Sequence, residues 1–151
     1  MGTTTFSGPV RSGTLKTGET NGPNLGYAVL EQQANLTQNS TTAVSETLYI
    51  PAGSKIIDII VDVLTAFDSG TSATLSVGIT AGGTEYASGV NAKTAGRTRP
   101  TFTAAQLAAM SNQTVLGAAA ATTAPVVITI TPSGATSAGY VNVTVVYAQL
   151  G

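Results

Sequence analysis

The sequence predicts an all-β protein: an antiparallel, jelly-roll-like β-sandwich with one short helix and an extended N-terminal arm. Three observations favour this class. The run from Lys55 to Ile79 alternates with period two, as a half-buried strand does. β-branched residues dominate that run, and they suit a pleated, half-buried surface. The same alternation returns at 139–149, close to the end of the chain.

Two strands with a turn between them form the centre of the predicted fold. On the first strand, Asp58 and Asp62 lie on one face, and a row of apolar residues lies on the other: Ile57, Ile59, Val61 and Val63. A second alternating run covers 73–80, after a cluster of Gly, Ser and Asp that is typical of a turn. We expect the two runs to pair as an antiparallel hairpin.

The other elements follow from shorter patterns. Further strands are expected at 26–34, 47–50, 84–90, 125–131 and 139–149. A helix is expected at 103–110, where Thr103 is a suitable N-cap and alanine is frequent. Because this helix has about two turns, it needs packing from Leu107 and Met110 to persist. Residues 111–124 are expected to form an exposed loop. Seven or eight strands of this kind suit a sandwich.

The predicted domains are an arm, 1–25, and a β-sandwich, 26–151. The arm is rich in Gly, Thr, Ser, Asn and Pro and carries few apolar residues, so alone it is expected to be flexible. It can be a disordered tail, or it can become ordered against another subunit. In the second interpretation Phe6 and Val10 are the apolar anchors, and Arg11 and Lys16 make the polar contacts.

Composition argues against several classes of function. The net charge is −1 and charged residues are 9% of the chain, against about 25% in typical soluble proteins. Nucleic-acid binding needs clustered Lys and Arg, so it is not expected. The chain has no Cys and no His, which removes disulfides, thiolate metal sites and the commonest general base. An enzyme and a cofactor are therefore not expected. No stretch approaches the length of a membrane span or a signal peptide.

A few side chains remain as candidates for chemistry or contact. Asp58 and Asp62 lie about 13 Å apart on a strand that rises ~3.3 Å per residue, too far for a carboxylate pair to act alone. We expect them on a solvated or interface face, opposite Thr, Lys or Arg of a neighbouring strand. Asp68, in Asp-Ser-Gly, is a weak calcium candidate without EF-hand spacing. The tyrosines are expected in the core or on sheet faces rather than in a sugar-binding platform.

The segment 91–100 holds half of the basic residues of the chain: Lys93, Arg97 and Arg99. It can be a solvated loop, or it can contact an acidic patch on a partner subunit. Of these, Arg97 and Arg99 are the candidates for partner contact.

Three phrases of the sequence resemble small virion proteins of tailed bacteriophages. They are T-T-F-S-G-P-V-R-S-G at Thr4–Gly13, the run Ile56–Gly78, and A-G-R-T-R-P-T-F-T-A-A-Q-L-A-A-M at Ala95–Met110. Together they cover roughly a third of the chain. The resemblance implies a head decoration, or cement, protein. Such proteins bind the outer surface of the capsid lattice, often as homotrimers, and they carry no catalytic or cofactor residues.

We therefore expect a structural virion protein that binds the major capsid protein and other copies of itself. It would be assembled in the cytoplasm of the bacterial host and would stay on the capsid surface. Two alternatives remain open at this stage. One is a tail, neck or fibre component of the same particle, and the other is a carbohydrate-binding adhesin module, which needs an exposed aromatic platform.

Overall fold

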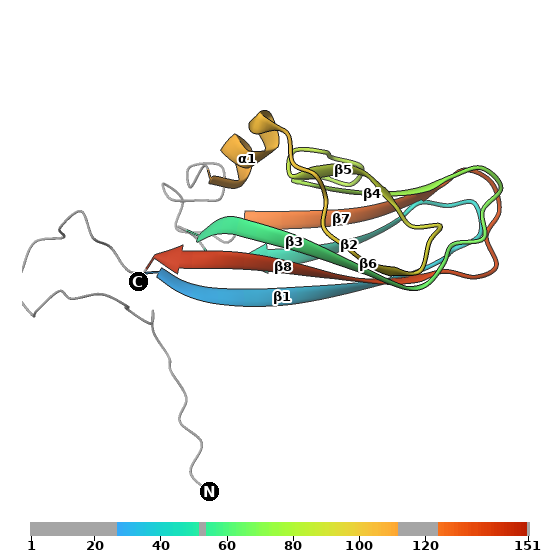
Figure 1. Cartoon of the computed structure of the whole chain (residues 1–151), viewed down its shortest axis with the longest axis horizontal. Helices are drawn as coiled ribbons and strands as arrows, with labels where there is room; N and C mark the ends of the chain where they lie inside the picture. The colour runs from blue at the N-terminus through green and yellow to red at the C-terminus, as the bar shows by residue number, and fades with distance from the viewer. Residues whose placement is uncertain (1–26, 52–53, 112–123, 151) are drawn as a thin grey trace, which may run out of the picture.

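The computed structural model describes residues 27–51, 54–111 and 124–150 (Figure 1). The predicted arm at 1–25, with its candidate residues Phe6, Val10, Arg11 and Lys16, lies outside these residues. The loop expected at 111–124 also lies almost wholly outside them.

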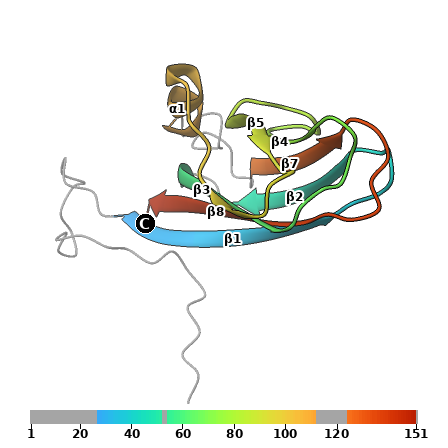
Figure 2. The same cartoon turned by 45° about the vertical axis from the view of Figure 1, so that its right-hand side comes forward.

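The described chain forms strands stacked in two layers, with one helix. The strands are β1 (Tyr27–Thr37), β2 (Val44–Ile50), β3 (Ser54–Thr65), β4 (Ala73–Gly78), β5 (Ala87–Asn91), β6 (Gly96–Thr98), β7 (Ala124–Pro132) and β8 (Tyr140–Leu150). The helix, α1 (Ala104–Ser111), follows β6. Figures 1 and 2 both show α1 beside β5 and near the beginning of β3.

The strand order is that of an eight-stranded jelly roll. Sheet A has the order β1-β8-β3-β6, and sheet B has the order β2-β7-β4-β5. Four antiparallel pairs follow the pattern of one long hairpin folded at its centre: β4 with β5, β3 with β6, β2 with β7 and β1 with β8. Antiparallel pairing of β3 with β8 and of β4 with β7 then joins these pairs into two sheets. The predicted all-β sandwich is confirmed.

The facing surfaces of the two sheets form the hydrophobic core. On β8, the alternation seen in the sequence buries Val141, Val143, Val145 and Tyr147. From sheet B, β7 and β4 contribute a matching row: Val126, Ile128, Ile130, Leu75 and Val77. Burying each such side chain stabilises the fold by about 1.5–3 kcal/mol. This core fixes which face of each sheet points outward.

The predicted hairpin in the centre of the chain is wrong. The two runs are β3 and β4, and they lie in different sheets. The connection between them, 66–72, carries the chain from sheet A to sheet B, so each strand finds its partners elsewhere: β3 pairs with β8 and β6, and β4 pairs with β7 and β5. Alternating residues predict a half-buried strand, but they do not say which strand lies beside it.

One part of the predicted face assignment is also wrong. The register of β3 against β8 shifts between Ile56 and Asp58, which marks a β-bulge at Ile57. A bulge adds one residue and reverses the alternation on its far side. Ile56 is therefore buried, whereas Ile57 is 45% exposed. From Asp58 onward the predicted faces are confirmed.

The helix begins as the sequence predicted. The amide of Gln106 donates to the Thr103 hydroxyl at 3.2 Å, and the amide of Thr103 donates to the Gln106 side-chain oxygen at 2.9 Å. This reciprocal arrangement is a capping box. Met110 is buried, as expected, but Leu107 is 49% exposed. The buried side chain that replaces it is Gln106, which donates to the Thr84 carbonyl and anchors α1 beside β5.

Candidate interaction surfaces

No described element lies over the outer face of sheet A, and its side chains form rows that follow the strand register. One row runs Glu31, Val146, Asp58, and the next runs Gln33, Thr144, Ile60. Each row contains both polar and apolar side chains. The exposed side chains Ile57 and Leu64 belong to the same strand, β3. A face that mixes polar and apolar side chains has the composition of a protein–protein interface.

Two ion pairs cross the edge of this face. Arg97 of β6 binds the carboxylate of Asp62 with both nitrogens of a fork, Nε to Oδ1 at 2.6 Å and Nη2 to Oδ2 at 2.8 Å. Arg99 binds Asp58, with 3.1 Å between Nε and Oδ2. The expectation that both aspartates lie on a solvated face opposite basic residues is confirmed.

The Asp62 pair perturbs both of its members. The hydrogen bond from Arg97 holds the pKa of Asp62 below its usual value. In turn, the hydrogen bond to Asp62 raises the pKa of Arg97. The guanidinium side chains remain 71% exposed at Arg97 and 66% exposed at Arg99. They can therefore meet a second carboxylate from outside without leaving their internal partners.

The basic segment at 91–100 is more ordered than the sequence suggested. Gly96–Thr98 is strand β6, so the segment is not simply a loop. The ammonium group of Lys93 donates to the carbonyls of Ser69 and Gly70. All three basic residues of the segment thus have partners within the chain, although residues 94–99 stay exposed to solvent.

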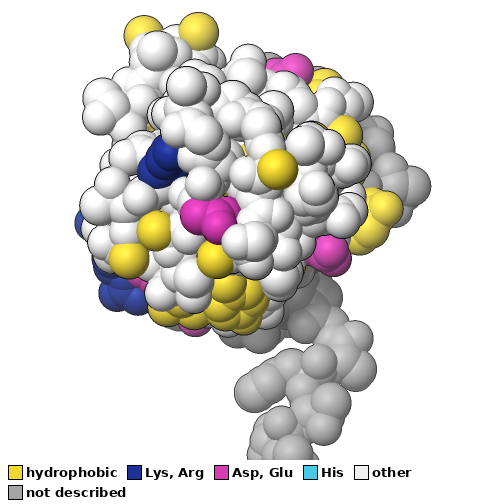
Figure 3. Space-filling model, turned by 90° about the vertical axis from the view of Figure 1, so that its right-hand side faces the viewer, with side chains coloured by type: hydrophobic (Ala, Val, Ile, Leu, Met, Phe, Trp, Pro, Cys, Tyr) yellow, Lys and Arg dark blue, Asp and Glu magenta, His cyan; other side chains and the backbone are white. Residues whose placement is uncertain are grey.

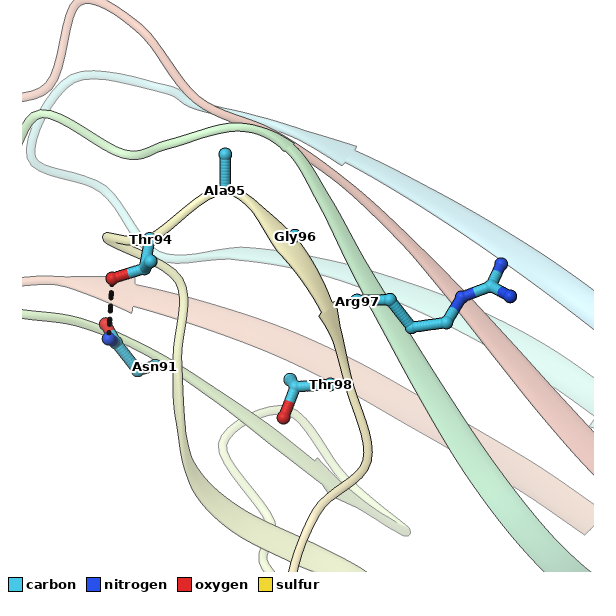
Figure 4. Close-up of a pocket in the computed structure, with 6 residues that line it drawn as sticks. All are labelled: Asn91, Thr94, Ala95, Gly96, Arg97 and Thr98. Atoms are coloured by element: carbon cyan, nitrogen blue, oxygen red, sulfur yellow. Dashed lines mark hydrogen bonds between the residues drawn. The ribbon is translucent and has the colours of Figure 1, made fainter.

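A hollow of about 280 Å³ lies beneath this segment, and Figure 4 shows the residues around it. It is lined by Asn91, Thr94, Ala95, Gly96, Arg97 and Thr98. Asn91 donates to the Thr94 hydroxyl at 3.2 Å, while the Arg97 side chain points away from both residues (Figure 4). The hollow is smaller than most ligand sites, and its charged residue is already engaged by Asp62. We assign no small-molecule site to it.

A network of hydrogen bonds joins the connections at one end of the sandwich. Asp68 accepts from the amides of Ser137 and Ala138 and from the Ser137 hydroxyl, at 2.9, 3.1 and 2.6 Å. These bonds, with the Ser137 hydroxyl first, lower the pKa of Asp68 to about 2. The Asp68 carboxylate therefore holds the connection between β7 and β8 in place. Figure 3 views this end, where most of the surface is neutral and the charged side chains are scattered.

Part of the outer face of sheet B is covered by its own chain. Residues 79–86 fold back over β4 and β7, and the amide of Gly82 donates to the Thr129 hydroxyl at 2.9 Å. Thr129 and Val127 are consequently buried, although they point away from the core. A side chain at Gly78 would lie 2.7 Å from Gly83 Cα, so glycine is required for this approach. The 84–90 strand of the sequence prediction accordingly begins later, as β5 at Ala87.

Two of the side chains considered for chemistry, Asp68 and Tyr86, are engaged or buried in the described structure. Among the described residues, no group of three acidic residues is placed to hold a metal ion, and the Asp68 carboxylate is already used by Ser137 and Ala138. Tyr86 is buried, and its burial raises the pKa of its hydroxyl to about 12, so it is a neutral core residue near pH 7. In the part of the chain that is described, no helix is long and apolar enough to cross a membrane.

The four tyrosines whose side chains are described do not form a platform. Tyr86 and Tyr147 are buried. Tyr49, which is 59% exposed, pairs with Pro125 near the beginning of β7, whereas Tyr140 lies at the beginning of β8 and donates to Asn35. The two lie at opposite ends of the sandwich, because β7 and β8 run from opposite ends.

Sequence reasoning missed two features that shape these surfaces. It did not identify Gln106, which appears in the sequence as an ordinary polar helix residue, although its position three residues after Thr103 signals a capping box. It also missed the cover over sheet B. The Gly-Gly pair at 82–83 could have indicated a close backbone approach there.

The fold and surfaces define a protein of the jelly-roll β-sandwich class. No protein-family model and no curated protein matches the sequence. Among solved structures, a chain of the "Cyanophage Pam1 capsid asymmetric unit" has a similar fold, with a TM-score of 0.54 and 18% sequence identity. The similarity covers 88% of this chain and 94% of that chain. It is a likeness of fold over nearly the whole of both chains.

Proposed function

We propose that this protein is a structural component of a bacteriophage virion that decorates and stabilises the outer surface of the capsid. Its partners would be the major capsid protein and further copies of itself, arranged as a homotrimer. The observation that carries the proposal is the likeness in fold, over 88% of this chain, to a chain of a phage capsid asymmetric unit. A fold alone does not define a function, so the proposal also depends on the surfaces and on the sequence resemblance.

The surfaces support a role in protein contact. The chain carries few charges, and those of the segment 91–100 are paired within the chain. The outer face of sheet A mixes polar with apolar side chains and carries no described element over it, whereas 79–86 covers part of the outer face of sheet B. Contact of many copies with a lattice can be firm even when each contact is weak, because bound neighbours raise the effective concentration.

Gold-labelled antibodies on intact particles test the location by electron microscopy, with an antibody against the major capsid protein as the control. Label spread over the heads is the expected result. Label confined to the tail or neck would contradict decoration and favour the other virion role. Absence of label from intact particles, with the protein present in the lysate, would contradict any virion role on the outer surface.

The arm is the first candidate for capsid contact, through Phe6, Val10, Arg11 and Lys16. Deletion of residues 1–24 leaves every described strand intact, so the remaining domain should keep its melting temperature and lose binding to undecorated capsids. A Phe6→Ala, Val10→Ala double variant should also bind more weakly, because it removes both apolar anchors. Cosedimentation measures the binding, and full binding by the deletion variant would exclude the arm.

The second candidate contact is the pair Arg97 and Arg99, which could meet an acidic patch on the capsid protein. Replacing both with Gln should weaken capsid binding, and the loss should be largest at low ionic strength. The matched control is Asp58→Asn with Asp62→Asn, which disrupts the same ion pairs but keeps both guanidinium groups. If the two double variants bind equally, the arginines act only within the chain.

A further inference from the structure

Each sheet of the sandwich has two edge strands, and features of the chain obstruct pairing at three of these four edges. An exposed edge is a template for pairing with another chain, so proteins usually obstruct it. β6 has three residues and is followed closely by Pro100. β5 has five residues, contains Gly89 at φ +67°, and shifts its register against β4. On β2, the Tyr49 carbonyl already accepts from the Gln32 side chain at 3.0 Å.

The fourth edge, β1, has none of these obstructions. It has 11 residues, pairs with β8 in an unbroken register, and contains no proline. Its one charged residue is Glu31. Val29, on its outer face, is 63% exposed. In Figures 1 and 2, β1 forms the margin of its sheet, with no described element beyond it.

The register shows which backbone groups face the free side of β1. Just beyond the strand, the Gln38 amide donates to the Gly139 carbonyl at 3.0 Å, so this pair is a hydrogen-bonded one. Bonded and non-bonded pairs alternate along an antiparallel ladder. The even-numbered residues of β1 therefore bond to β8. The odd-numbered residues direct their amides and carbonyls to the free side, where no described residue meets them: Val29, Glu31, Gln33, Asn35 and Thr37.

We propose that the free edge of β1 pairs with β1 of a second copy of this chain, antiparallel and about a two-fold axis at Gln32. This register overlaps the two strands over their full length, and it places bonded odd-numbered residues opposite one another. Glu31 of each copy then lies opposite Gln33 of the other, so a carboxylate meets an amide that can donate to it. Val29 lies opposite Asn35.

A different occupant fits the edge less well. The edges β2, β5 and β6 are obstructed, so a second copy can best offer its own β1. A two-fold axis at Glu31 would put two carboxylates opposite each other, which is destabilising. The axis at Gln32 avoids this repulsion. The inference rests on β1 alone and does not depend on the proposed capsid role. A two-fold contact cannot lie within a homotrimer, so in the proposed assembly β1 would join copies that belong to two different trimers.

Cysteine cross-linking tests the contact and its register, since the chain contains no cysteine. Residues in a bonded antiparallel pair have Cα atoms about 5.5 Å apart, within the range of a disulfide. A mixture of the Glu31→Cys and Gln33→Cys proteins should form a covalent dimer under mild oxidation. Either protein alone should form much less, because its cysteines lie diagonally, about 7–8 Å apart.

The matched control places cysteines two residues apart on the edge strand β2. A mixture of the Ser45→Cys and Thr47→Cys proteins should form little covalent dimer. Absence of the 31–33 product from the mixture, with both proteins folded, would overturn the proposal. This result would overturn the proposal in each of three cases: the β1 edge stays unpaired, another part of the same chain covers it, or a segment of a different protein pairs with it. A stronger product from Glu31→Cys alone would overturn the register.

A proline at Gln33 tests the hydrogen bonds. It removes an amide on the free side and leaves the β8 ladder intact, as proline does on an edge strand. Self-association measured by sedimentation should weaken by about tenfold or more, because each copy loses a donor and gains a steric obstacle. Thr47→Pro, at the equivalent free-edge position of β2, should not change it. Unchanged association in Gln33→Pro, with the fold retained, would contradict the proposal.

Discussion

The two margins of the sandwich differ in how far their edge strands are obstructed. At the margin formed by β5 and β6, the strands have five and three residues, α1 packs against β3 and bonds to β5, and arginines pair with Asp58 and Asp62. At the margin formed by β1 and β2, the strands have 11 and seven residues, and Gln32 bridges them. The first margin offers only short and obstructed edges, while β1 has a long edge that no described residue covers.

The largest expected loss of stability comes from a proline at an even-numbered position of β1, where the backbone bonds to β8. The Ala34 amide bonds to β8, and the side chain is buried. Ala34→Pro removes that ladder bond inside the fold and should destabilise it by about 3 kcal/mol or more. Urea unfolding measures the loss. Gln33→Pro, one residue earlier, should cost far less. Equal losses at the two positions would mean that the assignment of the free side is wrong.

A smaller loss of stability is expected at the margin formed by β5 and β6, where α1 packs. Met110 is 2% exposed, so Met110→Ala should cost about 2–3 kcal/mol through lost burial and a cavity. Leu107→Ala on the same helix is the control, because Leu107 is 49% exposed and should change stability by less than about 1 kcal/mol. If the two variants unfold at the same urea concentration, α1 does not pack as described.

The end of the sandwich where Asp68 joins two connections should respond to acid. Asp68 has a pKa of about 2 in the folded chain and 3.8 as its ordinary value. Its contribution to stability is therefore full above pH 3.8 and is lost as the pH falls toward 2. Asp68→Asn should flatten this part of the pH–stability curve in thermal melts. Asp62, whose pKa is also lowered, should leave a residual slope. An unchanged curve in Asp68→Asn would contradict the role of this carboxylate.

The smallest effect is expected from the exposed ion pair on β6. Asp62→Asn removes the anionic partner of Arg97, but solvent screens such pairs, so global stability should hardly change. The local effect should be visible as faster amide hydrogen exchange at Thr98, since β6 pairs with β3 over only three residues. Unchanged exchange at Thr98 would show that backbone pairing alone holds this edge.

The sequence predicted local structure better than partners. The alternation on β8 and the Thr103 cap were visible because each depends on residues that are near in sequence. The placement of β3 and β4 in different sheets was not, because a connection of seven residues suits a hairpin and a crossing between sheets equally well. The bulge lies at the second of two adjacent isoleucines, Ile56 and Ile57, and no Gly or Pro marks it in the sequence.

Predictions about the surfaces also succeeded for local features and failed for features that depend on the topology. Pairing of Asp58 and Asp62 with basic residues could be expected, since two carboxylates on one strand face need partners nearby. That the partners are Arg97 and Arg99 depends on β6 lying beside β3, which is a property of the whole topology. The free side of β1 likewise became visible only through its register with β8. Single-residue patterns do not contain this information.

The most direct measurement of the central claim is a reconstruction of the intact phage head by electron cryomicroscopy. We expect density for a two-layered, eight-stranded sandwich on the outside of the shell, separate from the major capsid protein and repeated over the lattice. Density that the major capsid protein explains completely, or this sandwich found in the tail or neck, would contradict the proposed role as a capsid decoration protein.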